Sequence, residues 1–570
     1  MKLSDYLAAF LAEYGVTHIF GYPGGAVTHI LDSLCKREDI GFVGTCHEQA
    51  AAFAAEGYAR IKNDIGVAFA TSGPGATNLI TGIGSAFFDS VPCLYITGQV
   101  NTYEYKGDLS VRQLGFQETD IVSVVKPITK YAVRITEPDT IKYELQKAIS
   151  VAKSKRPGPV LLDIPMDIQR AEIDPDRLSG YEEPEKEPAD CSWLPAAAEF
   201  IENAVRPVIL VGGGVRAAKA SALLERFAKK TGIPVVSSLM GLDACAGIEN
   251  SFGLIGAYGN RYGNFALANS DLILSLGSRL DSRQTGTDVE SFARRARLIR
   301  VDIDENELKR RVKPDELSIR MDAGDFLRAI SEAPEAVPRV KTDDWLKTVK
   351  GYREKYPSFS ADDFKNPNYI VREISKMAGE DDIICLDVGQ NQMWAAQSFE
   401  LKRGQRLLTS GGMGAMGFSL PAAVGAHYAA PGRSVIAFSG DGGFQMNIQE
   451  LELVKRNRIP IKMIVMNNRA LGMIRHFQEM YFEGRYGGTV TGYTAPDFCK
   501  IAGAYGIFSK SVENPKELSE IGEIIGERAA AVIGVRLPQH TYVFPKLAVG
   551  RPIEDQEPLL DRAEFFENMI

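Results

Sequence analysis

The sequence predicts an α/β protein built from three doubly wound parallel sheets. Short runs rich in β-branched residues alternate with Ala-rich helical patterns along nearly the whole chain, which is typical of parallel sheets covered by helices. Two Pro- and charge-rich stretches, near 168–192 and 332–368, lack a sustained apolar period, and we predict linkers with some local helix there. Three domains and a C-terminal tail are expected at 1–168, 190–335, 365–540 and 541–570.

Composition and charge place the chain among ordinary globular proteins. Of its 570 residues, 45% are hydrophobic and 24% are charged, which excludes a disordered or fibrous protein. The chain has 65 Lys and Arg against 73 Asp and Glu, a net charge of −8. Because this balance provides no general basic field, we expect no nucleic-acid partner and no binding to an anionic membrane.

The N-terminal segment and the cysteines predict a cytoplasmic protein. The segment MKLSDYLAAFLAEYG carries Asp5 and Glu13 and is typical of an amphipathic helix rather than a secretory signal. No stretch approaches the ~20 apolar residues of a membrane span. The seven cysteines are scattered and never spaced CxxC, which argues against a disulfide framework and against a Cys-ligated metal.

Glycine-rich or polar turns follow many of the predicted strands. In open α/β sheets, ligands bind beyond the carboxyl ends of the strands. Because such turns occur in all three units, we expect more than one bound nucleotide-like molecule. The segments that contain a strand and its turn are THIFGYPGGA, VAFATSGPGATN and CLYITGQ in the first unit, PVILVGGG, DLILSLGSRLDSR and LIRVDIDENE in the second, and IICLDVGQNQ, SVIAFSGDGG and IKMIVMNN in the third.

The third unit contains a candidate site for a metal ion and a diphosphate. Asp441 follows one predicted strand, a helix is expected at about 447–457, and Asn468 ends the next strand. A right-handed crossover would bring the carboxylate and the amide oxygen to the same sheet edge, where they suit Mg²⁺. Gly442 and Gly443 would leave backbone N–H groups free for a diphosphate. The alternative is that both polar residues only cap the segments that follow them.

The order strand, GDG, helix, strand, NN resembles the thiamine diphosphate enzymes. This resemblance implies that Asp441, the Asn468 side chain and the backbone carbonyl of Ala470 hold Mg²⁺. It also implies a diphosphate bound beside Gly440 and the two glycines that follow Asp441. By the same resemblance, the three domains are a pyrimidine-binding, a central FAD-type and a diphosphate-binding domain.

Glu48 is the candidate for the carboxylate that activates the cofactor. It stands at the predicted start of an Ala-rich helix, where an isolated Glu would most often only contribute to the helix dipole. The segment HEQAAAFAAEGYAR, however, resembles the family segment whose Glu protonates the cofactor's aminopyrimidine ring. Desolvation would raise the pKa of such a carboxyl and favour proton sharing. We expect His47 to pack or hydrogen-bond locally.

The resemblance also implies that two subunits share the active site. Glu48 and Asp441 belong to different units, and in the family the corresponding domains come from different subunits. A homodimer or homotetramer is therefore expected. Met416, in GGMGAMGFSLPAA, matches the hydrophobic residue beneath the bent cofactor, and Pro23 is a further predicted cofactor contact; outside this context Met416 would be read as a core residue.

The resemblance spans nearly the whole chain and is nearest to the acetolactate (acetohydroxyacid) synthase large subunit. The segments FGYPGGA, SGPGATN, GFQETDI and DVGQNQMWAAQ carry it. It implies that Gly25 lies by a substrate oxygen, that Phe116 and Gln117 border the acceptor, and that Lys130 lies near the active-site entrance. Without it, the same residues would be read as a turn glycine, a core aromatic, a surface amide and a solvated lysine.

The second unit is predicted to bind FAD. VGGGVRA fits GxGxxA, but no acidic residue follows about 20 positions later, so the dinucleotide signal is weak. The segments SSLMGLD, GLIGAYGN, LGSRLDSRQTG and VDIDENE resemble the FAD-binding domain of acetolactate synthases. Arg283 matches an Arg that reaches the acceptor carboxylate, although alone it would be read as a surface ion-pair partner. The implied FAD contacts are Gly213, Gly214, Leu239, Met240, Gly256, Arg279, Asp302, Ile303 and, beside the adenine, Asp322.

Three departures from the family pattern affect the choice of acceptor. Ser282 stands where the family usually has a second Asp, and Phe477 replaces a Trp that shapes acceptor choice. The C-terminal segment from Phe544 extends past the usual end and resembles thiamine enzymes of nucleotide-sugar pathways.

The sequence thus predicts a carboligase that depends on thiamine diphosphate, Mg²⁺ and FAD. It would decarboxylate pyruvate and transfer the two-carbon unit to a second pyruvate, giving 2-acetolactate for branched-chain amino-acid synthesis, with a structural flavin. The alternatives are transfer to a keto-sugar nucleotide, a flavin oxidase, and a non-catalytic nucleotide-binding subunit. The last should have lost Glu48, Asp441 or Asn468, and all three are present.

Overall fold

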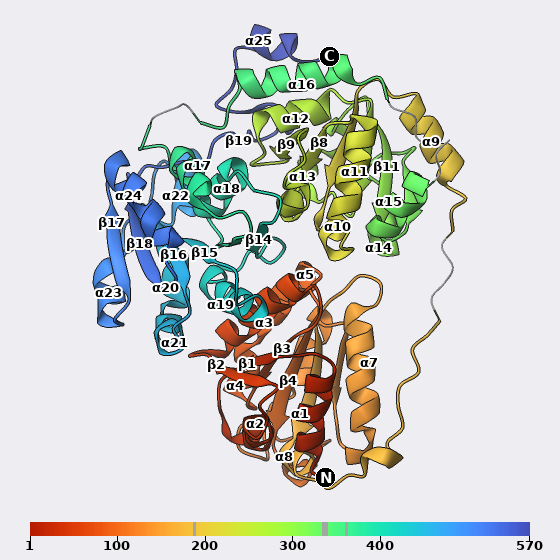
Figure 1. Cartoon of the computed structure of the whole chain (residues 1–570), viewed down its shortest axis with the longest axis vertical. Coiled ribbons are helices and arrows are strands. Elements are labelled where there is room, and N and C mark those ends of the chain that lie inside the picture. The colour runs from red at the N-terminus through yellow and green to blue at the C-terminus, as the bar shows by residue number, and fades with distance from the viewer. Residues whose placement is uncertain (186–189, 333–339, 360–362) are drawn as a thin grey trace.

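Three α/β units make up the chain in a computed structural model (Figure 1). The structure describes residues 1–185, 190–332, 340–359 and 363–570. Parts of both predicted linkers, at 186–189, 333–339 and 360–362, lie outside the described residues. Within the described residues, no helix has the length and apolar character needed to span a membrane.

The N-terminal unit is a six-stranded, all-parallel sheet in the order β2-β1-β3-β4-β6-β5. Strands β3, β4 and β6 are buried along their whole length, as expected for a parallel sheet covered on both faces. The strands are β1 (His18–Gly21), β2 (Gly41–Gly44), β3 (Gly66–Ala70), β4 (Cys93–Gln99), β5 (Tyr131–Arg134) and β6 (Val160–Pro165). The helices are α1 (Leu3–Glu13), α2 (Thr28–Cys35), α3 (Glu48–Lys62), α4 (Pro74–Asn78), α5 (Ile80–Phe88), α6 (Ile121–Val125), α7 (Ile141–Lys153) and α8 (Met166–Gln169).

The C-terminal unit repeats this strand order. Its sheet runs β14-β13-β15-β16-β18-β17, which is again second, first, third, fourth, sixth, fifth. The strands are β13 (Ile383–Leu386), β14 (Arg406–Thr409), β15 (Val435–Gly440), β16 (Ile461–Asn467), β17 (Phe508–Val512) and β18 (Ala531–Arg536). The helices are α17 (Pro367–Met377), α18 (Gln390–Ser398), α19 (Ser419–Ala429), α20 (Asp441–Met446), α21 (Leu451–Arg456), α22 (Gly472–Tyr481), α23 (Phe498–Ala504) and α24 (Pro515–Gly526).

The helix expected at about 447–457 is observed at 448–456, with a 3-10 helix as its first turn. Helix α20 ends at Met446, Asn447 departs from helical geometry at φ −131° and ψ 30°, and α21 begins only at Leu451. A short 3-10 helix, η8 (Ile448–Glu450), joins the two. The predicted helix is therefore confirmed to within one residue at each end, whereas α20 before it was not expected; Asn447, a poor helix former, separates the two.

The central unit has the strand order β12-β11-β10-β7-β8-β9. In this doubly wound order, the first three strands extend the sheet to one side of β7 and the last three extend it to the other side, beginning with β10. A crevice therefore opens at the carboxyl ends of the neighbouring strands β7 and β10. The strands are β7 (Pro207–Val211), β8 (Val235–Ser237), β9 (Ser251–Leu254), β10 (Leu272–Leu276), β11 (Arg297–Asp302) and β12 (Leu317–Arg320). The helices are α9 (Leu194–Glu202), α10 (Gly213–Ala217), α11 (Ser221–Thr231), α12 (Arg261–Ala268), α13 (Ser282–Thr285), α14 (Glu305–Lys309) and α15 (Ala323–Glu332).

The predicted tail docks on the central unit. Strands β19 (Lys546–Leu547) and β20 (Gln556–Glu557) form a small antiparallel ribbon, and α25 (Arg562–Glu567) follows. Phe565 of α25 packs in the core of the central unit against Phe265. Helix α16 (Asp343–Lys355), within the second predicted linker, lies beside α25 (Figure 1) and joins the same core through Trp345. Both segments are therefore integral parts of the central core.

Glycines allow helices α3 and α19 to pack closely where the N- and C-terminal units meet. A Cβ added to Gly425 of α19 would lie 1.8 Å from the carbonyl oxygen of Ala54 in α3. A Cβ added to Gly57 of α3 would lie 2.3 Å from the carbonyl oxygen of Ala422 in α19. The backbones of the two helices are therefore in direct contact at these positions.

We expect Gly425→Ala to destabilise the protein, because the new methyl group would collide with the backbone of α3. Overpacking of a tight interior contact costs about 1–3 kcal/mol. Gly351→Ala is the matched control: Gly351 is exposed in α16, nothing lies within 4 Å of an added Cβ, and Ala is the better helix former. Thermal unfolding should show a lower midpoint for Gly425→Ala only. Equal midpoints for the two variants would contradict the close packing.

Candidate functional site

Glu48 is the first residue of α3 and is 93% buried. His47 accepts the N–H of Gln49 at 3.1 Å with its Nδ1 and so caps the helix, which confirms the predicted local role of His47. The Asn78 side chain donates to Glu48 Oε2 at 2.9 Å. This contact fixes one carboxyl oxygen and leaves Oε1 without a hydrogen-bond partner among the described contacts.

Other candidates gather near Glu48 at the carboxyl edge of the N-terminal sheet. Gly24 lies against Thr71, whose hydroxyl accepts the N–H of Ala26 at 3.1 Å. A Cβ on Gly75 would lie 2.7 Å from Thr71 Cγ2 and 3.1 Å from Glu48 Oε1. The turn that holds Pro23 and Gly25 therefore lies beside the turn that faces Glu48.

Phe116 and Gln117 belong to the same edge. A Cβ on Gly73 would lie 3.0 Å from Gln117 Cβ, so the two turns touch. Gln117 has a left-handed backbone, at φ +63°. Phe116 is 85% exposed, which corrects the reading of it as a core aromatic.

The structure places Lys130 at the opposite edge of this sheet. Lys130 directly precedes β5, and its backbone N–H donates to the carbonyl of Pro159, which directly precedes β6. Its Nζ donates to the carbonyls of Val151 and Ser154 at the end of α7. Lys130 thus binds the carboxyl terminus of a helix, which does not support a position beside Glu48.

The predicted metal ligands of the C-terminal unit lie together. Asp441 follows β15 and Asn468 follows β16, and these strands are paired in register, Gly440 opposite Met466. The Asn468 Nδ2 donates to Gln390 Oε1 and to Thr541 Oγ1, each at 2.9 Å, and its Oδ1 accepts the N–H of Ala470 at 3.2 Å. The amide is therefore held on both sides.

The donor set at this edge fits a divalent cation. Asp441 is 97% buried, and its Oδ2 has no hydrogen-bond partner. Burial raises the pKa of Asp441 to about 6, because a carboxylate is costly to ionise without a cation or further donors. Within the described residues no group of three or more His, Cys, Asp and Glu could hold a metal. A cation here would need further oxygens, as Mg²⁺ takes from phosphate and water.

Met416 lies against Gly442 of the GDG turn. A Cβ on Gly442 would lie 3.3 Å from the Met416 Cε, so this side chain reaches the turn. The adjoining loop is fixed by Asp387, which accepts the N–H groups of Gly417 and Ser419 at 2.9 and 3.0 Å. Sequence reasoning missed Asp387, although its place directly after β13 was a usable signal.

Gln390 and Thr541 were also missed. Gln390 lies in DVGQNQMWAAQ, which was read only as a family motif. Thr541 gave no signal, because it lies at the predicted start of the tail and reaches Asn468 only in the folded chain.

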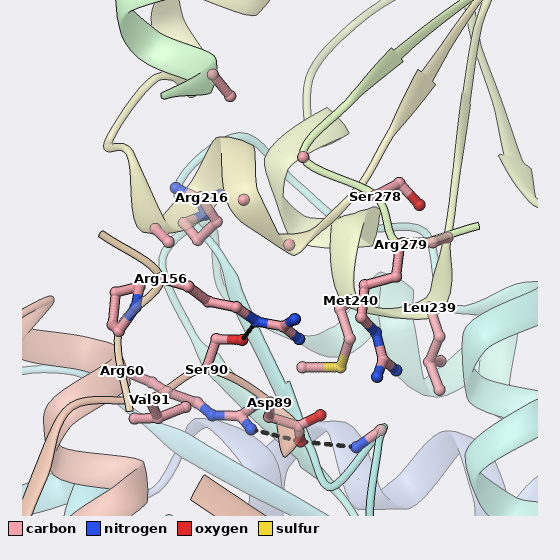
Figure 2. A pocket seen from close by; sticks show the side chains of 18 of the residues that line it. Arg60, Asp89, Ser90, Val91, Arg156, Arg216, Leu239, Met240, Ser278 and Arg279 are labelled. Atoms are coloured by element: carbon pink, nitrogen blue, oxygen red, sulfur yellow. Dashed lines mark hydrogen bonds and ion pairs between the residues drawn. The ribbon is translucent and has the colours of Figure 1, made fainter. Parts of the chain in front are cut away.

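A cavity of about 610 Å³ lies at the carboxyl edge of the central sheet (Figure 2). This volume is within the roughly 300–1,000 Å³ of small-molecule sites. Gly256 does not line it; its carbonyl-side neighbour, Ala257, does, and Gly256 itself lies against the carbonyl of Arg283. The predicted residues that do line the cavity are Gly213, Gly214, Leu239, Met240, Arg279, Arg283, Asp302, Ile303 and Asp322.

Glycines shape the crevice between β7 and β10. A Cβ on Gly212 would lie 2.0 Å from the carbonyl oxygen of Gly277, and one on Gly214 would lie 2.8 Å from the Gly277 Cα. Gly277 itself has φ +57°. The turns after the two strands therefore touch through their backbones, which leaves room for a ligand above them.

Residues of the other two units complete the cavity. Figure 2 shows Met240 extending from the central unit toward Ser90 and Arg156 of the N-terminal unit, with Arg279 and Leu239 beside it. Arg156 donates to Ser90 Oγ at 2.8 Å and pairs with Asp304 and Glu307 of the central unit. Sequence reasoning missed these N-terminal residues, because no local pattern shows which surface faces another unit.

Asp89 connects the cavity to the Met416 loop. Its carboxylate pairs with Arg60 at 2.8 Å and accepts the N–H groups of Gly411 and Gly412 at 2.9 and 2.7 Å. Arg60, Asp89 and Gly411 all line the cavity. The cavity wall and the loop that carries Met416 are therefore one hydrogen-bonded unit.

Models of three domains of one protein family match the chain. They are the N-terminal TPP binding domain, the central domain and the C-terminal TPP binding domain of thiamine pyrophosphate enzymes, matching residues 1–124, 194–330 and 387–535. The chain belongs to the thiamine pyrophosphate enzyme family. The matches follow the order of the three units, and the predicted fold of three parallel-sheet α/β domains is confirmed.

The relatives of this thiamine pyrophosphate enzyme include acetolactate synthases. The acetolactate synthase large subunit of Lactococcus lactis subsp. lactis (strain IL1403) is 40% identical over 561 residues, 96% of this chain and 94% of that protein. The acetolactate synthase large subunit of Corynebacterium glutamicum is 38% identical over 98% of this chain and 90% of its own length. The chloroplastic acetolactate synthase 2 of Nicotiana tabacum is 37% identical over 97% and 85%. The predicted resemblance is thereby confirmed.

We expect Asp441→Ala to weaken Mg²⁺-dependent binding of thiamine diphosphate, because it removes the buried carboxylate with the unpaired oxygen. Loss of residues that merely support metal ligands costs about 10–100-fold in affinity, so losing a ligand should cost at least ~100-fold. Titration calorimetry with and without Mg²⁺ measures this. Asp139→Ala, at an exposed aspartate, is the control. Unchanged affinity in Asp441→Ala would exclude this carboxylate as a metal ligand.

Proposed function

We propose that this enzyme is a carboligase that decarboxylates pyruvate and transfers the two-carbon unit to a second pyruvate, giving 2-acetolactate. One observation carries the proposal: the buried Asp441, with its unpaired Oδ2, and Asn468 follow two paired strands. The chain that holds them is similar over nearly its whole length to acetolactate synthases. Asp441, Asn468 and the carbonyl of Ala470 would hold Mg²⁺ on the cofactor's diphosphate.

The surroundings of Glu48 are suited to proton transfer between its carboxyl group and the cofactor. Bound thiamine diphosphate would supply an electron sink for the decarboxylation. Glu48 would hold a proton at Oε1 for the aminopyrimidine ring, while Asn78 holds Oε2. Its burial excludes water that would otherwise compete for that proton.

We further propose that two copies of the chain share each active site, in a homodimer or homotetramer. No hydrogen bond or ion pair among the described residues joins Glu48 to the Asp441 turn. Several large apolar side chains are exposed on each of the two units, and where such side chains form a contiguous patch they mark protein contacts. On the N-terminal unit they are Tyr22, Leu109, Val111, Leu114 and Phe116, and on the C-terminal unit Met446, Ile474, Phe477, Met480 and Tyr481.

FAD is the proposed occupant of the central cavity. The cavity lies at the reversal point of a doubly wound sheet, where dinucleotides bind. Among the described residues, six arginines line the cavity and would favour an anionic ligand: Arg60, Arg156, Arg216, Arg279, Arg283 and Arg406. The proposed reaction has no net redox change, so the flavin would be structural.

A keto-sugar nucleotide is the alternative acceptor, and Phe477 is the observation that favours it. Phe477 is 53% exposed on α22 and packs beside Tyr481, with ring centroids 4.5 Å apart. A phenyl ring takes less space than the indole expected in acetohydroxyacid synthases. A wider acceptor space would admit a larger carbonyl compound.

We expect the enzyme loaded with Mg²⁺, thiamine diphosphate and FAD to convert pyruvate alone into acetolactate, measured as pyruvate loss and product formed. Glu48→Gln should bind the cofactor yet lose most turnover, because its amide cannot donate the proton. Glu137→Gln, at an exposed position, is the control.

Slow pyruvate loss with acetaldehyde instead of acetolactate would favour the keto-sugar alternative. Near-wild-type turnover of Glu48→Gln would remove Glu48 from the mechanism. Rapid oxygen consumption with pyruvate would point to an oxidase.

We expect Arg279→Ala to bind FAD more weakly, because the guanidinium lines the cavity and, among the residues that the structure describes, forms an ion pair with the partly exposed Asp281 alone. Loss of a hydrogen bond to a charged group costs about 1.5–3 kcal/mol, or roughly 10–100-fold in affinity. Flavin absorbance retained after ultrafiltration measures the binding. Arg328→Ala, at an exposed arginine paired with Asp325 on α15, should retain flavin as the wild type does. Equal retention in both variants would argue against the cavity as the FAD site.

A further inference from the structure

Glu450 is a fully buried carboxylate at the junction of the N- and C-terminal units. It is the last residue of η8, and its side chain reaches the turn between β2 and α3. Oε1 and Oε2 accept the N–H of Cys46 at 3.0 and 3.1 Å, and the N–H of His47 also interacts with this carboxylate. The two residues held in this way directly precede Glu48.

Residues next to Glu450 hold the same turn from both sides. Arg456 donates to the carbonyl of Gly44, the last residue of β2. Asn447 donates to Gln49 Oε1 at 3.3 Å, and also to the carbonyl of Gly417 at 2.8 Å. The segment 447–456 therefore contacts the chain before and after Glu48.

Burying the ionised Glu450 carboxylate costs free energy, so its hydrogen bonds to the turn must compensate for that cost. Burial raises the pKa of Glu450 to about 7, and no salt bridge to Glu450 offsets that burial in the described part of the chain. The Cys46 and His47 N–H groups precede the helix and have no partner within it. A charged acceptor binds such groups more strongly than a neutral one.

We infer that Glu450 is a positioning residue for Glu48. By fixing the Cys46–His47 turn, it fixes where α3 begins and hence where the Glu48 carboxyl lies. This inference rests on the proposed function, in which Glu48 protonates the cofactor. Glu450 itself touches no reacting atom.

The test uses Glu450→Ala and Glu450→Gln in the full-length enzyme, each alone and combined with Glu48→Gln. The first readout needs no cofactor: amide hydrogen exchange of residues 44–49 should speed up at least about tenfold in Glu450→Ala. Glu450→Gln keeps one acceptor oxygen and should fall between it and the wild type. Glu452→Ala, exposed on α21 two residues away, should match the wild type.

The second readout is the exchange of the cofactor's C2 proton for deuterium, the step assigned to Glu48. Glu450→Ala should slow it about 10–100-fold while the dissociation constant of thiamine diphosphate changes less than twofold. In the Glu48→Gln background, Glu450→Ala should cause no further slowing, because residues that act through one another are not additive.

Three results would overturn the inference. They are unchanged amide exchange at 44–49 in Glu450→Ala, unchanged C2 exchange, and equal slowing in the wild-type and Glu48→Gln backgrounds, which would indicate a general structural role. If the wild type fails to bind thiamine diphosphate, the proposed function fails instead. In that case, the amide exchange still decides whether Glu450 holds the turn.

Discussion

The direct contact between helices α3 and α19 is the constraint on which the arrangement of the outer units depends. Gly57 and Gly425 bring the two backbones together, and the Ala-rich surface of α3 is buried around them. Because protein interiors are close-packed, such a contact has no room to slide. Glu48 begins the same helix, so the packing that joins the units also sets the position of the proposed proton donor.

Much of the fold could be predicted from local sequence. Strands buried on both faces appear as continuous apolar runs, and the turns that follow them hold Gly and polar residues, so the three sheets and their ligand-binding edges were recognisable. Asp441 and Asn468 could be paired because one crossover joins their strands. The identical strand order of the outer sheets was not predictable, because nothing local specifies which strands pair.

What the sequence did not predict depends on contacts between distant segments. Lys130 was expected near the active-site entrance from the family resemblance alone, and its contacts with the end of α7 form only in the folded chain. The tail has no sustained apolar period, since its ribbon and α25 are short and are held by side chains of the central unit such as Phe265. Arg156 and Asp89 reach the central cavity only after the units have docked.

The central cavity also has a consequence for the maturation of the chain. All three units supply its walls, so it exists only when they have folded and docked. Any molecule that binds there binds the assembled form alone, and its binding free energy adds to the stability of that assembly. Occupancy would therefore report correct assembly. Because Asp89 connects the cavity wall to the Met416 loop, binding in the cavity would also stabilise the position of that loop.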